Sequence, residues 1–295
     1  MVRKGLLALG LIAGVALATP NAPAQNSQAV AVKENGQSAL KEAIGKLKKE
    51  ELSKVIQDAA KAFQETNQAL LLLQRGKTSE ALTVLKRVDA LLQKLINQYG
   101  LVKLPVDVQF VEFNGITDLQ VAQEYNKRVK ELVAQNNFVD ARFLLALLRD
   151  EIDVITTYMP LDVYKQAIDL AVKMLEEGKT DAALLAIQSA LGTLEVETVI
   201  VPKPILEAQL LVQKAQEVYK VNPAMAKQLV SRAEYDLKLA VALGYIRSEE
   251  DIKPLVEKLE ELKKAITEHA ANIGEKFQKA KEGMKEIRQE STVTR

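Results

Sequence analysis

The sequence predicts a mainly α-helical protein built from repeated antiparallel helical hairpins that form a bundle or array. Leu, Ala, Val, Ile, Lys, Glu and Gln dominate the 295 residues, and only 4% are aromatic, with no Trp, which is typical of helices. Apolar residues recur at spacings of three and four over long stretches. A turn signature returns between these stretches, at residues 75–81, 135–141, 177–183 and 220–226.

Each copy of this turn signature ends in an alanine, at Ala81, Ala141, Ala183 and Ala226. A small residue on the first turn of a returning helix lets the two helices of a hairpin approach closely. We therefore expect all four alanines to lie buried where the paired helices touch.

Residues 1–24 have the pattern of a secretory signal peptide. Arg3 and Lys4 precede an uncharged apolar run over residues 5–18, and residues 22–24 fit a small-residue cleavage site. The run is shorter than the ~20 residues that cross a bilayer as a helix, which disfavours an uncleaved anchor. The absence of Cys excludes a lipid-modified cysteine, a disulfide framework and thiolate chemistry. We expect cleavage near Ala24, a periplasmic location and no membrane span after cleavage.

A long amino-terminal helix is expected after a short leader. Residues 25–37 are polar and predict a flexible leader into the fold. From Ser38 to about residue 74 the apolar residues keep helical spacing, and Gly76 is placed to end this helix in the left-handed conformation. A second helix is expected over residues 78–99. The helical-hairpin domain should extend over residues 38–247.

Two segments predict β structure within this helical chain. Residues 106–113 lie in a non-helical insert and are rich in β-branched and aromatic residues, and residues 196–201 have a similar composition. Isolated strands are marginally stable unless they pair and pack on other elements. We therefore expect a two-stranded ribbon against the helices.

Several helix boundaries carry recognisable signals. Thr117 and Ser248 each begin a capping-box pattern, and Asn222 followed by Pro223 fits a cap and the first helical residue. Gly244 is placed to close the helix that begins at Pro223. These signals predict helix starts near residues 118, 223 and 249.

Residues 248–295 predict one long carboxy-terminal helix with a frayed tail. An apolar residue recurs along it every seven positions, at Leu259, Ile266, Ile273, Ala280 and Ile287. This narrow seam is typical of a coiled coil. Its partner would be the amino-terminal helix of the same chain or the same helix in an oligomer, and a free single helix is the third option.

Charge and side-chain chemistry argue against nucleic-acid binding and against catalysis. Lys and Arg number 40 against 39 Asp and Glu, a formal charge of +1, and the signs are interleaved rather than gathered in a basic stripe. The single histidine, His269, is expected to be solvated beside the seam. The sequence contains no nucleophile elbow, zinc-binding helix motif or phosphate loop. We predict a non-enzymatic protein without catalytic residues, cofactor or metal site.

Two acidic clusters are candidates for acid–base chemistry or for binding a hard cation. Asp150, Glu151 and Asp153 are expected on different faces of a helix, and Glu195 and Glu197 along an exposed strand edge. Both arrangements favour carboxylates that simply face water. We assign neither cluster a functional role.

Four short segments give the chain a resemblance to a known family. Their order and spacing resemble the pattern of the bacterial YfdX family, at residues 157–161, 177–180, 201–208 and 242–245. The resemblance is good over roughly residues 103–245, and the tail after about Lys264 is longer than is usual for that family. It implies an exported, mainly helical protein associated with stress responses, with no established enzymatic activity and no catalytic residues to transfer.

The sequence favours a periplasmic interaction or stress-protective protein that binds a protein partner, or itself, through its helical surfaces. One alternative is a small-molecule binder with a pocket where the turn at residues 202–204 meets Tyr158 and Tyr245. A further alternative is a tetratricopeptide-like scaffold that binds peptides, although the repeat here is longer and lacks that family's W-x-x-L-G-x-x-Y pattern.

Overall fold

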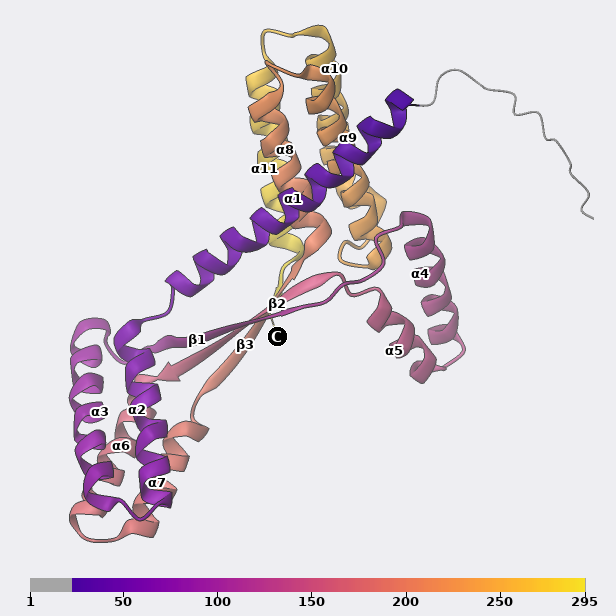
Figure 1. Cartoon of the computed structure of the whole chain (residues 1–295). Helices are drawn as coiled ribbons and strands as arrows, with labels where there is room; N and C mark the ends of the chain where they lie inside the picture. Colours follow the sequence, from indigo (N-terminus) through magenta and orange to yellow (C-terminus); the bar gives the residue numbers. More distant parts are fainter. Residues whose placement is uncertain (1–22, 295) are drawn as a thin grey trace, which may run out of the picture.

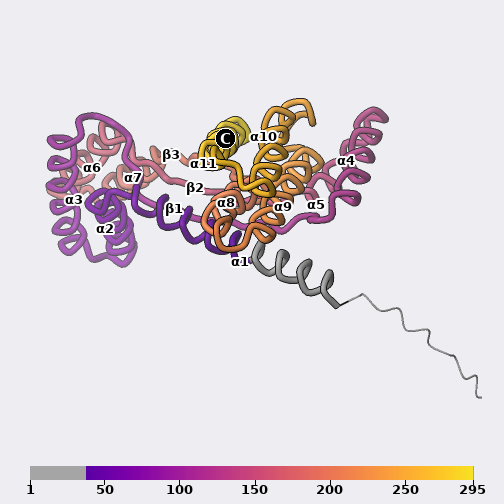
Figure 2. Tube along the Cα trace, turned by 90° about the horizontal axis from the view of Figure 1, so that it is seen from above, coloured from indigo at the N-terminus to yellow at the C-terminus, as the bar shows by residue number. Residues whose placement is uncertain are grey.

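The computed structural model describes residues 23–294 and confirms that the protein is mainly helical. A narrow antiparallel sheet extends between two helical bundles, and a separate helical hairpin projects beside the second bundle (Figure 1). From the perpendicular direction these three helical parts follow one another along a single axis (Figure 2).

Two of the helical parts are bundles with separate hydrophobic cores. The first bundle contains α2 (Gln57–Gln74), α3 (Thr78–Tyr99), α6 (Leu161–Glu176) and α7 (Thr180–Gly192). The second bundle contains α1 (Pro23–Ser53), α8 (Lys203–Val218), α9 (Pro223–Leu243), α10 (Glu249–Glu268) and α11 (Ile273–Ser291). The side hairpin consists of α4 (Leu119–Ala134) and α5 (Phe138–Leu147), and it packs against the end of α9.

The expected two-stranded ribbon is wrong, because the sheet has a central strand that the sequence did not reveal. Its strands are β1 (Lys103–Glu112), β2 (Glu151–Pro160), β3 (Glu195–Pro202) and β4 (Val293–Thr294), all antiparallel and in that order. The two expected strands, β1 and β3, do not pair with each other. Each pairs with β2 instead, which therefore joins the two bundles along its length.

The hairpin prediction is confirmed at all four turns. The alanines at residues 81, 141, 183 and 226 are at most 2% exposed, each on the first turn of a returning helix. Gly76, Asn136 and Gly178 have positive φ angles of 72°, 58° and 74°, which ends the preceding helix as a left-handed turn. The fourth turn has no left-handed residue. There the Asn222 side chain accepts a hydrogen bond from the Met225 amide at 3.0 Å and caps α9, as Asn137 caps α5 at the second turn.

The amino-terminal segment departs from the sequence prediction at two places. α1 begins at Pro23, so the flexible leader expected over residues 25–37 is helical. The single helix expected over residues 38–74 is broken between Ser53 and Gln57. There the Ile56 amide donates to the Pro105 carbonyl oxygen at 3.0 Å, which fixes the start of α2 on β1. Residues 1–22 of the expected signal peptide lie outside the described residues.

The carboxy-terminal segment is a hairpin rather than one long helix. His269 has a φ of 52° and ends α10, and α11 returns from Ile273. The heptad residues lie in the core of the second bundle, where Leu259, Ile266 and Ala280 are at most 1% exposed, so the seam packs within the chain. The expected frayed tail is also wrong, because Val293 pairs with Ile200 of β3.

Other boundaries agree with the helix signals. Ser248 forms a capping box with Asp251, and Gly244 closes α9 with a φ of 88°. The cap of α4 is Asp118 rather than Thr117, since the Asp118 carboxylate accepts from the Val121 amide. Over residues 23–294, no helix combines the length and the apolar character needed to cross a membrane.

Candidate functional site

A cluster of buried polar side chains lies where the sheet meets the second bundle. We call this cluster the hub; it contains Asp150 and Glu151 at the start of β2, Lys203 at the start of α8, and Tyr245 just after α9. Asp150, Glu151 and Lys203 are only 7%, 4% and 3% exposed. Charged groups at this depth require partners, and the hub supplies them from segments far apart in sequence.

Lys203 connects the hub to the loop that follows β1. Its Nζ atom donates to the Phe113 carbonyl oxygen and to the Asn114 Oδ1 atom, each at 2.7 Å. The same nitrogen lies 3.7 Å from Oδ1 of Asp150. Burial raises the pKa of Asp150, and the nearby Lys203 charge opposes this rise.

Tyr245 joins the end of α9 to the start of β2. Its hydroxyl accepts a hydrogen bond from the Asp150 amide at 2.8 Å and donates one to Glu151 Oε2 at 2.8 Å. Burial raises the pKa of this phenol, and the Glu151 charge adds to the effect. Arg149 occupies the other oxygen of Glu151 and also donates to Asp153 Oδ2 at 2.9 Å. The hub is thus an internally satisfied network that fixes the sheet to the second bundle.

Gly115 allows the loop after β1 to approach the hub. A Cβ atom at this position would lie 2.6 Å from the Arg149 carbonyl oxygen, closer than real Cβ atoms come to backbone. The Gly115 amide instead faces Asp150 Oδ1 at 3.4 Å. The requirement is therefore for space rather than for an unusual backbone conformation.

A second buried acidic group lies beside the hub on α9. Asp236 is completely buried, and its Oδ1 atom lies 2.9 Å from Nε of Arg232 one helical turn earlier. Burial raises the pKa of Asp236 well above its ordinary value, and the charges of Glu207 and Asp150 raise it further. Burial likewise raises the pKa of Glu207. Asp236 was not among the predicted site residues, although a charged residue within the apolar face of a helix was the available signal.

An open cavity of about 490 Å³ lies on the outer side of the hub, and we call it the cleft. Its walls come from α5, the start of β2, β3, the end of α9 and the carboxy-terminal segment. The lining residues are Arg142, Leu145, Ala146, Leu148, Arg149, Glu151, Ile200, Leu243, Gly244, Tyr245, Ser291 and Val293. The cleft therefore combines an apolar wall with hub side chains on one side.

Helix α5 has an unusually apolar exposed surface. We call Val139, Phe143 and Leu147 the outer stripe, because their spacing of four places them along one side of the helix. They are 81%, 68% and 41% exposed, and Ala141 is the buried residue of this helix. The neighbouring side of α5, with Arg142 and Ala146, faces the cleft.

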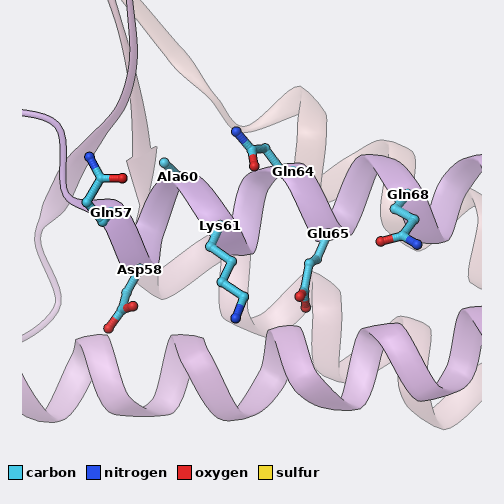
Figure 3. A pocket seen from close by; sticks show the side chains of 7 residues that line it. All are labelled: Gln57, Asp58, Ala60, Lys61, Gln64, Glu65 and Gln68. Carbon is cyan, nitrogen blue, oxygen red and sulfur yellow. The ribbon is translucent and has the colours of Figure 1, made fainter. Parts of the chain in front are cut away.

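A second cavity, of about 510 Å³, is a shallow polar surface along α2. All of its lining residues belong to this one helix, with Asp58, Lys61 and Glu65 pointing to the same side (Figure 3). Asp58 and Glu65 are engaged with Lys94 and Arg87 of α3. The surface is thus a face of exposed ion pairs and lacks the enclosure of a binding pocket.

Several predicted site residues lie elsewhere than expected. Asp150, Glu151 and Asp153 were expected on a helix, but Glu151 and Asp153 lie on β2 and Asp150 directly precedes it. Tyr158 is near the opposite end of β2 from the hub, and Lys103 lies 5.0 Å over its ring, so it forms no pocket with Tyr245.

The remaining candidates stay on the surface. Glu195 and Glu197 both contact Lys103 across the sheet. His269 is exposed, as expected. In the described part of the chain, no group of three His, Cys, Asp or Glu side chains is arranged to hold a metal ion.

Comparison with known proteins gives a family match for the middle of the chain. Residues 62–200 match the model of the family described as YfdX protein. Among solved structures, that of Salmonella Typhi YfdX is 14% identical, with a TM-score of 0.36, over 49% of this chain and 90% of that chain. No curated protein matches the sequence. The expected family resemblance is confirmed over the matched range.

Proposed function

The chain belongs to the YfdX family, and from this premise we propose that it is an exported, non-enzymatic protein that protects other proteins under stress. In this proposal it binds the apolar segments that partly unfolded proteins expose. The observation that carries the proposal is the outer stripe of α5, whose three apolar side chains face solvent.

The outer stripe has the chemistry that such a partner requires. Val139 and Phe143 expose 81% and 68% of their surface, and Phe138 at the start of α5 exposes 58%. On an amphipathic helix, apolar side chains normally face the core instead. Contiguous exposed apolar surface on a folded protein marks sites of interaction. Apolar side chains recognise a partner by area rather than by directed hydrogen bonds, which suits partners of varied sequence.

The position of the side hairpin supports the same function. α4 and α5 project at one end of the molecule, away from the first bundle (Figure 2). Because α5 contacts its neighbours through few buried residues, an extended segment could lie along it without disturbing either bundle.

A test of this function is the suppression of insulin aggregation after reduction with dithiothreitol. This assay is suitable because the chain contains no Cys and is itself unaffected by the reductant. The wild-type protein should delay light scattering, and Phe143→Asp should abolish most of the delay. Leu185→Asp, which alters a 65% exposed leucine on α7, is the matched control and should behave as wild type. Equal activity of Phe143→Asp and wild type would overturn the proposal.

Export is a separate part of the proposal and has its own test. It is supported by the basic start, apolar run and small-residue site over residues 1–24. Intact mass of the protein from the periplasmic fraction should match a chain that begins near Gln25. A full-length chain retained in the cytoplasm would contradict export without affecting the proposed role of the outer stripe.

The tetratricopeptide-like alternative does not agree with the structure. Successive hairpins do not stack in order, because α2–α3 packs on α6–α7 whereas α4–α5 lies at the other end of the sheet (Figure 1). For the small-molecule alternative, Tyr158 does not line the cavity beside Tyr245, but the cleft itself remains a candidate pocket.

A further inference from the structure

We propose that the cleft beside α5 binds small amphipathic anions, with an aliphatic body against its apolar wall and a carboxylate at Arg142. This site is distinct from the outer stripe, since Arg142 and Ala146 lie on the neighbouring side of α5. The inference deepens the small-molecule alternative and does not depend on protection of other proteins.

The size and construction of the cleft are those of a ligand site. Its volume of about 490 Å³ falls within the range of pockets that hold small molecules. Its apolar wall comes from α5, the segment between α5 and β2, β3, α9 and β4, through Leu145, Leu148, Ile200, Leu243 and Val293. Convergence of separate segments gives the wall a fixed shape that a single helix face lacks.

The charges around the cleft favour an anion. Two positive residues, Arg142 and Arg149, line the cleft against one negative residue, Glu151. Arg149 is paired with Glu151 and with Asp153, which does not line the cleft, and its guanidinium lies 3.4 Å from the centroid of the Phe113 ring. Both carboxylate oxygens of Glu151 are occupied, one by Arg149 and the other by the Tyr245 hydroxyl. Neither group is therefore free to attract or repel a ligand strongly.

Arg142 supplies the charge that remains. Its exposed guanidinium forms no ion pair with the other described side chains. A guanidinium presents a planar set of donors that matches the two oxygens of a carboxylate. The combination of an apolar wall and one unbalanced guanidinium selects a ligand with a long aliphatic part and a single negative group.

Calorimetric titration of the purified protein with decanoate tests the site. Decyltrimethylammonium, which has the same chain length and the opposite charge, is the comparison ligand. Decanoate should bind with a stoichiometry of one, and the cation should bind at least tenfold more weakly. Equal affinity for the two ligands would overturn the assignment, because the cleft would then recognise only the aliphatic chain.

Two substitutions place the binding event in the cleft. Ala146→Trp should fill the cleft and weaken decanoate binding at least tenfold, and Arg142→Gln should weaken it about threefold to fivefold, as expected for an exposed charged contact. Their matched controls, Ala134→Trp on α4 and Arg75→Gln after α2, are exposed changes outside the cleft and should leave the affinity unchanged. Unchanged binding in both cleft variants, or equal losses in the controls, would refute the site.

A third variant separates this site from the proposed function. Phe143→Asp should retain decanoate binding even where it fails to suppress aggregation, because Phe143 does not line the cleft. Loss of decanoate binding in this variant would show that the ligand lies on the outer stripe and would also overturn the assignment to the cleft. Melting curves of every variant are recorded to check that the fold is intact. If Ala146→Trp unfolds, Arg142→Gln still tests the site, because it changes an exposed residue.

Discussion

Replacing Lys203 by Met should destabilise the protein more than any other single change at the hub. Lys203 is 3% exposed, and Met fills similar space while removing the charge and all three donors. The Phe113 carbonyl and the Asn114 side chain then lose their 2.7 Å partner, and Asp150 loses its nearest cation.

The magnitude follows from the burial of these groups. Removing one member of a buried ion pair costs about 3–5 kcal/mol, because the remaining charge stays in a poorly hydrated place. Protonation of Asp150, whose pKa burial already raises, limits the cost at acidic pH. We expect the free energy of unfolding at pH 7 to fall by about 3–5 kcal/mol. If this free energy decreases by about 3 kcal/mol per molar urea, the urea midpoint should fall by about 1–2 M.

The assay is urea unfolding followed by far-ultraviolet circular dichroism. Lys103→Met is the matched control, since Lys103 also contacts two carboxylates but lies on the exposed sheet, and its midpoint should hardly change. Adding Asp150→Asn to Lys203→Met should recover part of the loss by removing the unpaired charge. A loss below about 1 kcal/mol for Lys203→Met, or no recovery in the double variant, would refute the electrostatic account of the hub.

Three further changes test other parts of the structure. Burial raises the pKa of Asp236 above its ordinary value of 3.8, so its contribution to stability is present below that value and falls as pH rises through the folded-state pKa. Asp236→Asn should therefore raise the melting temperature at pH 7 and flatten its fall between pH 4 and 7; an unchanged profile would contradict the assignment. Gly115→Ala should cost about 1–3 kcal/mol in urea unfolding, because the new Cβ would meet the Arg149 carbonyl at 2.6 Å, and wild-type stability would show that the loop moves freely. Ala183→Leu should overpack the α6–α7 contact and lower the free energy of unfolding by about 1–3 kcal/mol. Ala134→Leu, at an exposed position, should leave it unchanged. Equal melting temperatures for the two variants would contradict the proposed close packing of the hairpin at Ala183.

The hairpins could be predicted because their signals are local. Each turn has a left-handed residue, a side-chain cap or both, followed within seven positions by a small residue on the first returning turn. Each of these signals acts through its nearest neighbours. Gly76 and Gly178 illustrate this, since their positive φ angles follow from the absence of a side chain.

β2 could not be recognised from alternation because neither of its faces is simply polar. Glu151 and Ile152 are both buried, and the strand pairs on both sides over residues 152–158. Its β-branched content over residues 152–157 was the available signal. The acidic residues at its start were therefore assigned to a helix, and the hub that they build was not foreseen.

The reversal at His269 was hidden by the spacing of the seam. Ile266 and Ile273 lie seven positions apart across the turn, so the heptad continues unchanged through a break in the helix. No Gly or Pro marks the turn, and a left-handed histidine is a weak sequence signal. The cleft was unpredictable for a related reason, because its wall joins segments whose proximity depends on β2.

The central place of β2 also has a consequence for the order in which the chain folds. Each helical hairpin closes through contacts that are near in sequence, whereas Lys103 must find Pro160, and Val199 must find Thr294, across long intervening segments. Contacts between residues far apart in the sequence form late, because closing a long loop costs chain entropy before the contact contributes any stabilising energy. In pulsed hydrogen exchange during refolding, amides of α2–α3 and α6–α7 should acquire protection before those of the sheet, so that β2 closes the molecule as its final step.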